Sequence, residues 1–362
     1  MDNMRLNPDR LKIARLRRKY TYVALASATG LSSKSVAEYE KADGLFPPSE
    51  QTIRLLAKTL NYPISFLCGN DTEFVDPSTV SFRSLKSMKA ADQHAAEAAG
   101  SLGVIVNNYF ENTFNLPYCN LPDFRGYEPE AAAEALREKW GLGVKSISNM
   151  IHLLEANGIR VFSLSENTLD VDAFSFWKNE TPYVFLNTRK SAERSRFDAA
   201  HELGHLVLHR HGSPQGKGAE EEADNFASAL LMPRRTILAI KMPFPTLDGI
   251  ISIKTDWRVS AVALTVRMKN VGILTEWQYR TLMVEATKRG LRKEEINSIP
   301  RERSLVIDKL LQVLKSDKIG IRTLAAILSI PVDELSNLLF KVGVITGGGA
   351  SSGREQPNLK LV

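Results

Sequence analysis

Residues 201–205 read His201-Glu202-Leu203-Gly204-His205, and this stretch decides how the middle of the chain folds. Four residues of a helix turn about 400°, so the two histidines project from one side, about 6 Å apart along the axis. Their ring nitrogens can then converge on one tetrahedral Zn²⁺. Glu202 lies one residue on and can reach water at the metal without competing for the ion. The spacing predicts His201 and His205 as metal ligands and Glu202 as the catalytic carboxylate.

The residues on either side of this motif are small or apolar. Ala199, Ala200, Leu206 and Val207 predict a buried helix, in which histidines need partners other than solvent. Four of the six histidines of the chain fall between positions 201 and 211. Gly204 would let a second backbone approach this helix closely.

A third ligand is needed, and two residues compete for the role. His211 follows His201 by ten positions, which suits a helix broken by glycine, but position 208 is Leu208. An unbroken helix would carry His211 about 15 Å along the axis from His201. Glu220 on the next predicted helix is the favoured ligand. Asp224, four residues further on, could accept the outer N–H of a ligand histidine.

The pattern around these two helices predicts an α+β fold. Three apolar runs rich in Val, Ile and aromatic residues precede them and predict a small antiparallel sheet: 159–164, 173–177 and 183–186. Helical periodicity marks the segments 131–140, 147–156, 192–209 and 219–232, and continues through 248–342. A glycine-rich tail follows and is expected to be disordered.

The run RFDAAHELGH at 196–205, followed by Glu220-xx-Ala223-xx-Phe226-Ala227-xx-Leu230-Leu231-Met232-Pro233, resembles the ImmA/IrrE family of metallopeptidases. The resemblance covers about 130–235 with specific motifs and 236–340 more loosely. It implies a zincin-like fold and cleavage of a repressor protein, with His201, His205 and Glu220 as ligands and Glu202 as the base. One departure is Asp224, where many relatives have asparagine. An aspartate there favours metal binding, because it makes its histidine partner more basic.

Residues 5–68 predict five short helices. Thr21 and Ser32 are good N-caps, and Gly30 permits the positive φ of a turn between the second and third helices. The pattern Leu25-Ala26-x3-Gly30-Leu31-Ser32-x3-Val36 resembles the Cro/C1-type (XRE) helix-turn-helix, with Leu25, Val36 and Leu60 in a common core.

The resemblance makes the third helix the recognition helix, which would present Ser33, Lys34, Ala37 and Glu38 to base edges. Seven of the first 20 residues are basic, and Arg17 and Arg18 are predicted to lie near DNA phosphates. Tyr22 departs from the family, which usually has a glutamine that contacts phosphate at this position. The alternative is a five-helix module that docks on protein and no longer binds DNA.

Composition indicates which partners and which cellular compartment suit the protein. The chain has 362 residues, a formal charge of +6 and a pI near 9.1, which are compatible with nucleic-acid binding. Cys68 and Cys119 lie far apart, so a disulfide framework is not expected and a reducing compartment fits. The sequence has no apolar run of the kind that a signal peptide or a membrane-spanning helix needs. We therefore expect a cytoplasmic protein without a membrane partner.

These observations predict a helix-turn-helix domain at 1–68, a linker and connecting helix at 69–125, and a zincin-like domain at 126–246. A helical C-terminal domain at 247–342 and a flexible tail at 343–362 complete the chain. The leading hypothesis is a zinc endopeptidase that binds duplex DNA and cleaves a transcriptional repressor in a stress response or mobile element. The alternative is a DNA-binding regulator whose zincin domain only senses. A His₂Glu site also accepts Mn²⁺. The protein could also form a homodimer. Candidate donors to the oxyanion of the tetrahedral intermediate are Tyr183, Asn187, Arg196 and His209.

Overall fold

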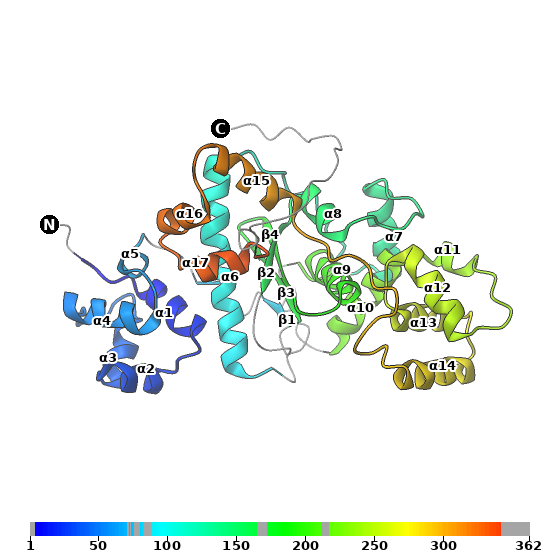
Figure 1. The fold of residues 1–362 in the computed structure, drawn as a ribbon, viewed down its shortest axis with the longest axis horizontal. Coiled ribbons are helices and arrows are strands. Elements are labelled where there is room, and N and C mark those ends of the chain that lie inside the picture. Colours follow the sequence, from blue (N-terminus) through cyan, green and yellow to red (C-terminus); the bar gives the residue numbers. More distant parts are fainter. Residues whose placement is uncertain are drawn as a thin grey trace.

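The computed structural model describes residues 4–70, 72, 74–75, 80–82, 88–164, 172–210 and 217–341. Its order confirms the predicted α+β class: helices at the N-terminus, a small sheet between long helices, and helices to the end (Figure 1). Among the described helices, none is long and apolar enough to cross a membrane. The predicted tail at 343–362 lies outside the described residues.

The N-terminal region forms the five predicted helices: α1 (Pro8–Arg17), α2 (Tyr22–Thr29), α3 (Ser33–Tyr39), α4 (Glu50–Leu60) and α5 (Ile64–Leu67). Both predicted caps are confirmed, because Thr21 accepts from the backbone N–H of Ala24 and Ser32 accepts from that of Ser35. Gly30 takes a φ of 70° at the end of α2. Leu25, Val36 and Leu60 are buried in one core.

The sheet differs from the predicted antiparallel one. Its order among the described residues is β1-β3-β4-β2. The strands are β1 (Ser81–Phe82), β2 (Arg160–Leu164), β3 (Ala173–Lys178) and β4 (Thr181–Asn187). β3 pairs antiparallel with β4 and with β1, but β2 runs parallel to β4. The three predicted runs are strands, whereas β1 and the parallel pair come from contacts between distant segments.

Alternation along the strands gives the sheet two different faces. On one face lies a layer of stacked rings, in which Phe174 and Phe185 have centroids 4.6 Å apart. Helix α6 (Ala90–Thr113) covers that layer (Figure 1). It approaches closely because position 103 is glycine: a Cβ there would lie 2.5 Å from Cζ of Phe185. The opposite face carries α9 (Ala192–Leu208), the helix that contains His201 and His205.

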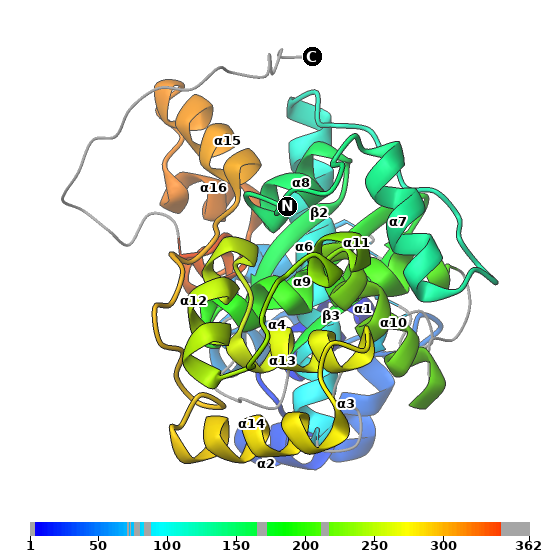
Figure 2. The same ribbon diagram turned by 90° about the vertical axis from the view of Figure 1, so that its right-hand side faces the viewer.

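Helix α10 (Lys217–Leu231) packs along α9, and Gly204 makes the contact close as predicted. A Cβ at Gly204 would lie 3.2 Å from Cα of Ala223 and 3.1 Å from the Phe226 ring. The core around this pair also includes five further helices: α7 (Pro129–Lys139), α8 (Met150–Ala156), α12 (Leu247–Trp257), α13 (Ala261–Asn270) and α14 (Glu276–Lys288). The short α11 (Arg234–Leu238) follows α10 (Figure 2). Its Ile237 is buried in the same core.

A second core joins the two ends of the chain. It combines the N-terminal helices, α6 and the last three helices, which are α15 (Leu305–Ser316), α16 (Ile321–Leu328) and α17 (Val332–Leu338). Segment 69–125, predicted as a linker and connecting helix, therefore supplies both a strand of the sheet and the helix on which α1 packs. The predicted C-terminal domain contributes α12–α14 to one core and α15–α17 to the other.

Candidate metal centre and DNA-reading face

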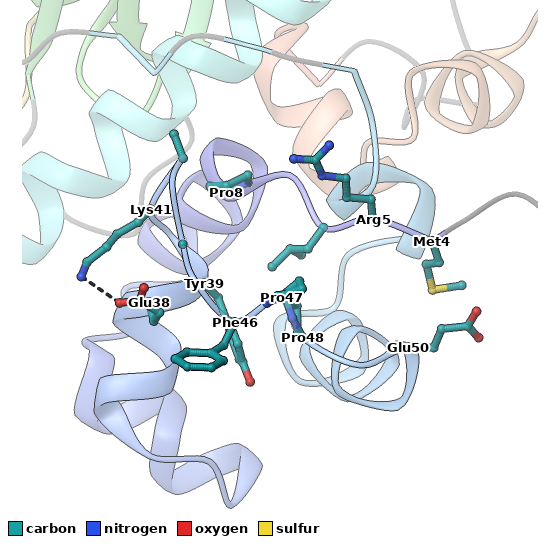
Figure 3. Close-up of a pocket in the computed structure, with 13 residues that line it drawn as sticks. Met4, Arg5, Pro8, Glu38, Tyr39, Lys41, Phe46, Pro47, Pro48 and Glu50 are labelled. Atoms are coloured by element: carbon teal, nitrogen blue, oxygen red, sulfur yellow. Dashed lines mark hydrogen bonds and ion pairs between the residues drawn. The ribbon is translucent and has the colours of Figure 1, made fainter.

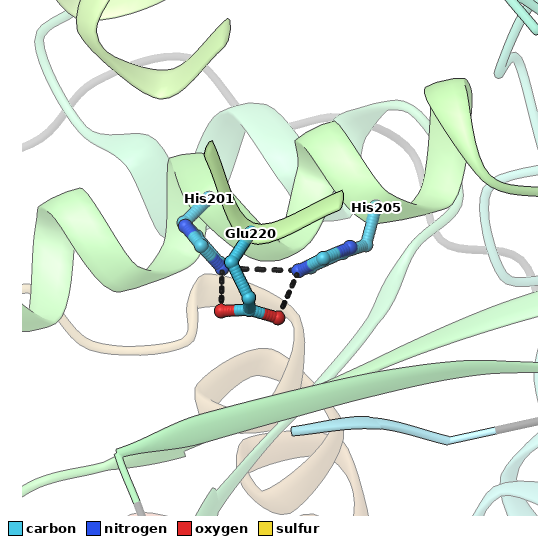
Figure 4. Close-up of side chains that lie close together, drawn as sticks. All are labelled: His201, His205 and Glu220. Atoms are coloured by element: carbon cyan, nitrogen blue, oxygen red, sulfur yellow. Dashed lines mark hydrogen bonds and ion pairs between the residues drawn. The ribbon is translucent and has the colours of Figure 1, made fainter. Parts of the chain in front are cut away.

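The structure brings His201, His205 and Glu220 together between α9 and α10 (Figure 4). Nε2 of His205 lies 3.0 Å from Nε2 of His201. The two carboxylate oxygens of Glu220 lie 3.5 Å from Nε2 of His201 and 3.3 Å from Nε2 of His205. Ligands about 2.0–2.1 Å from one tetrahedral zinc are about 3.3 Å apart. The donor set and its three spacings therefore fit a divalent ion such as zinc.

Burial sets the protonation states that a metal site needs. It lowers the pKa of His205 to about 4, so the ring is neutral near pH 7 and can offer a lone pair. Burial works in the opposite direction on Glu220, but its close contacts with the His201 and His205 rings outweigh burial and lower the pKa of the carboxyl to about 2. A neutral imidazole and a carboxylate are the forms of these side chains that bind a cation.

Glu202 is fully buried beside the two histidines. The hydroxyl of Ser175 on β3 donates to its Oε2 at 2.6 Å. Ser175 belongs to the face of β3 that meets α9, and its neighbour on that face, Trp177, donates from Nε1 to the carbonyl of Leu206 at 3.2 Å. These two contacts from β3 fix the position of α9 against the sheet and the orientation of one carboxylate oxygen of Glu202.

Nδ1 of each histidine also has a close polar partner. The partner of His201 lies on α10, and the partner of His205 lies at the end of α9. Oδ1 of Asp224 lies 2.8 Å from Nδ1 of His201, in the supporting position predicted for it. Nδ1 of His205 instead lies 3.0 Å from Nδ1 of His209, whose Nε2 is 2.8 Å from Oε2 of Glu222. The competing ligand His211 lies outside the described residues.

The candidate oxyanion donors have other partners. Tyr183 lies on the sheet face that α6 covers, where Asn107 donates to its hydroxyl at 2.9 Å. The Arg196 guanidinium is buried and paired with Glu302 and the carbonyl of Ile147. Oδ1 of Asn187 accepts from the backbone N–H of Arg189. His209 lies against His205 and Glu222.

On α3, Lys34 is exposed and Ser33 and Ala37 are half-buried. Glu38 differs from the prediction, because it is held by the loop after α3. It accepts from Nζ of Lys41 at 2.8 Å and from the backbone N–H of Leu45 at 3.1 Å. The Lys41 hydrogen bond, with that from Leu45, lowers the pKa of this exposed carboxyl. The same loop lines one side of a pocket of about 520 Å³ between α3 and the N-terminal segment (Figure 3).

Arg17 and Arg18, which were predicted to lie near phosphates, form ion pairs with α17 in this structure. Nε of Arg17 is 2.7 Å from Glu334 on α17, and Nη1 of Arg18 is 2.9 Å from the same carboxylate. Arg17 and Glu334 are almost fully buried. Lys19 likewise pairs with Asp92 on α6 at 2.7 Å. These cations fix the helix-turn-helix region to the rest of the protein.

Ser175 and Glu222 emerge as functional candidates only with the structure, and His209 takes a different role from the oxyanion donor predicted for it. Ser175 carries a weak sequence signal, since it is a polar residue on the apolar side of a strand. His209 carries a stronger one, because it repeats the four-residue spacing of His201 and His205. Nothing in the sequence separates Glu222 from its neighbour Glu221.

Comparison with known families agrees with this geometry. Residues 154–269 match a peptidase family model described as the IrrE N-terminal-like domain. Residues 11–67 match a helix-turn-helix model. A search of curated proteins finds no match. The first match contains the whole ligand cluster and the second contains α3 and its caps, so the chain joins a helix-turn-helix domain to an IrrE N-terminal-like domain of a peptidase family.

Proposed function

We propose that this protein is a zinc-dependent endopeptidase that also binds duplex DNA and cleaves a transcriptional repressor. The observation that carries the peptidase part is the cluster of His201, His205 and Glu220 with Glu202 beside it. A purely structural zinc site has no use for an additional buried carboxylate, whereas hydrolysis needs a base next to the ion.

When bound, zinc would polarise the scissile carbonyl and a water molecule. Glu202 would take the proton from the attacking water and later return it to the leaving amine. The hydroxyl of Ser175 holds Oε2 of this carboxylate at 2.6 Å, which supports one fixed orientation for the proton transfer. Asp224 holds the ring of His201.

The regulatory part of the proposal rests on the domain combination. A helix-turn-helix domain implies DNA binding, and a peptidase domain implies a protein substrate. A repressor at the same DNA would be within reach, and its cleavage would relieve repression after stress or in a mobile element. The family resemblance of the motif helices supports this choice of substrate.

The test compares wild-type protein with Glu202→Gln against repressors encoded beside it. The variant should keep its zinc and its fold, because only the proton acceptor changes. Its cleavage rate should fall by about 10²–10⁴, the usual contribution of a general base. Cleavage by Glu202→Gln at the wild-type rate would refute the proposed chemistry.

The second candidate function is a DNA-binding regulator whose metal domain senses without cleaving. One observation favours it: the helix-turn-helix region and α6 share a core, and α6 also covers the sheet, so a change at the sheet can reach the DNA-binding helices. In that case zinc removal would change DNA affinity, and Glu202→Gln would leave regulation in cells intact.

A further inference from the structure

His209, at the end of α9, lies directly behind the ligand His205. The two Nδ1 atoms are 3.0 Å apart, and Nε2 of His209 is 2.8 Å from Oε2 of Glu222 on α10. The His209 side chain is 14% exposed. His205, His209 and Glu222 therefore form a line that starts on the side of His205 turned away from Glu220.

The directions of these hydrogen bonds follow from the role of His205. Its Nε2 faces His201 and Glu220, so this nitrogen must carry the lone pair that binds a cation. A neutral imidazole then has its proton on Nδ1. That N–H donates to Nδ1 of His209, which leaves the proton of His209 on Nε2. From there it is donated to Glu222.

We propose that His209, supported by Glu222, is the positioning residue for the metal ligand His205. It selects the tautomer and the ring orientation of His205, as Asp224 does for His201. Outer hydrogen bonds of this kind raise the basicity of a ligand histidine and limit its rotation. The inference rests on the proposed metal site, and it adds residues that touch neither metal nor substrate.

The competing explanation is an ordinary surface ion pair. Glu222 is 54% exposed, and exposed pairs contribute little to stability. Glu221, its neighbour on α10, is 67% exposed and lies 3.9 Å from Lys217. Glu221→Gln is therefore a matched control, since it removes the same charge from the same helix without touching the line to His205.

Zinc affinity of the full-length protein, measured by competition with a chelator, tests the proposal directly. His209→Ala should weaken zinc binding about 10–100-fold, the usual effect of losing such a partner. Glu222→Gln should weaken it by less, because His209 keeps its contact with His205. Glu221→Gln should bind zinc like the wild type.

Two further variants separate positioning from packing. Gln at 209 offers an oxygen that can accept from Nδ1–H of His205, whereas Lys at 209 has only donors. His209→Gln should therefore recover most of the zinc affinity lost in His209→Ala, and His209→Lys should not. In the zinc-bound wild type, nitrogen NMR should show His209 with its proton on Nε2.

Equal zinc affinity of wild type and His209→Ala, within about twofold, would overturn the inference, as would equal affinities of the Gln and Lys variants. Circular dichroism establishes that each variant is folded, and the Gln-to-Lys comparison decides if the Ala variant is not. Because zinc is measured, the outcome does not depend on cleavage. A wild type that binds zinc and cleaves nothing would refute only the peptidase function, and one that binds no zinc would refute both.

Discussion

Two buried polar clusters connect separate parts of this chain, and they differ in how far apart their members lie in the sequence. The ligands His201, His205 and Glu220 belong to two successive helices. Arg17 and Glu334 are 317 positions apart and meet at the joint between α1 and α17. In the first cluster, the four-residue spacing of the two histidines already predicts metal binding from the sequence. The second consists of ordinary charged residues whose role depends on which other surface they meet.

The largest effect should come from removing a metal ligand. A zinc site of this kind binds with about 10–16 kcal/mol in all. Loss of one of three ligands should then cost on the order of 4 kcal/mol, or about 10³-fold in affinity. Glu220→Ala should show this loss in a chelator competition, and Glu221→Ala should not. The reverse result would mean that the helical spacing was misread.

The joint should be costly to break from one side. Glu334→Ala leaves Arg17 buried without its carboxylate, and such losses cost about 3–5 kcal/mol. Urea unfolding of the full-length protein measures the free energy of unfolding. The double variant Arg17→Met, Glu334→Leu is the control and should be far milder, because both charges leave together. If Glu334→Ala unfolds like the wild type and binds DNA more tightly, Arg17 is a phosphate contact after all.

The buried carboxyl group of Glu155 on α8 should make the stability of the protein depend on pH. It accepts from the backbone N–H groups of Leu305 and Val306 at the start of α15, yet burial outweighs these bonds and raises its pKa from 4.5 to about 7. The folded state thus favours the protonated form. Its contribution, on the order of 3 kcal/mol, is complete below about pH 4.5 and is lost as the pH rises through about 7.

Thermal unfolding at a series of pH values tests this. Glu155→Gln should remove that part of the decline between about pH 4.5 and 7, since a neutral amide replaces the carboxyl. A decline of the same size in wild type and variant would assign the pH dependence to other groups.

The smallest effect is expected at the reading helix. Lys34→Ala should weaken sequence preference at one or two base pairs by roughly 1–3 kcal/mol, if the lysine contacts a base edge. Fluorescence titration of full-length protein against selected and random duplexes measures it. A uniform loss on all duplexes would make Lys34 a phosphate contact. No binding to any duplex at about 50 mM salt would leave the domain as a protein-docking module.

Local signals account for what the sequence predicted well. The caps Thr21 and Ser32, the turn at Gly30 and the ligand pair on α9 each depend on residues a few positions apart. The parallel pairing of β2 with β4 was not predicted, because an apolar run shows that a strand exists and not which neighbour it joins. The ion pairs of Arg17 and Arg18 with Glu334 were not predicted for a similar reason, because Glu334 lies at the other end of the chain.

The fixation of α1 to α6 and α17 restricts how the protein can act on DNA. A peptidase on a loose tether samples every direction around the duplex. Here the proposed reading helix α3 shares a core with α6 and one face of the sheet, and α9 packs on the other face of that sheet (Figure 1). The ligand cluster would then point to one side of the DNA axis. Because the duplex repeats about every 10–10.5 base pairs, moving a bound substrate by about five base pairs would place it on the far side. A shift of about ten would bring it back within reach.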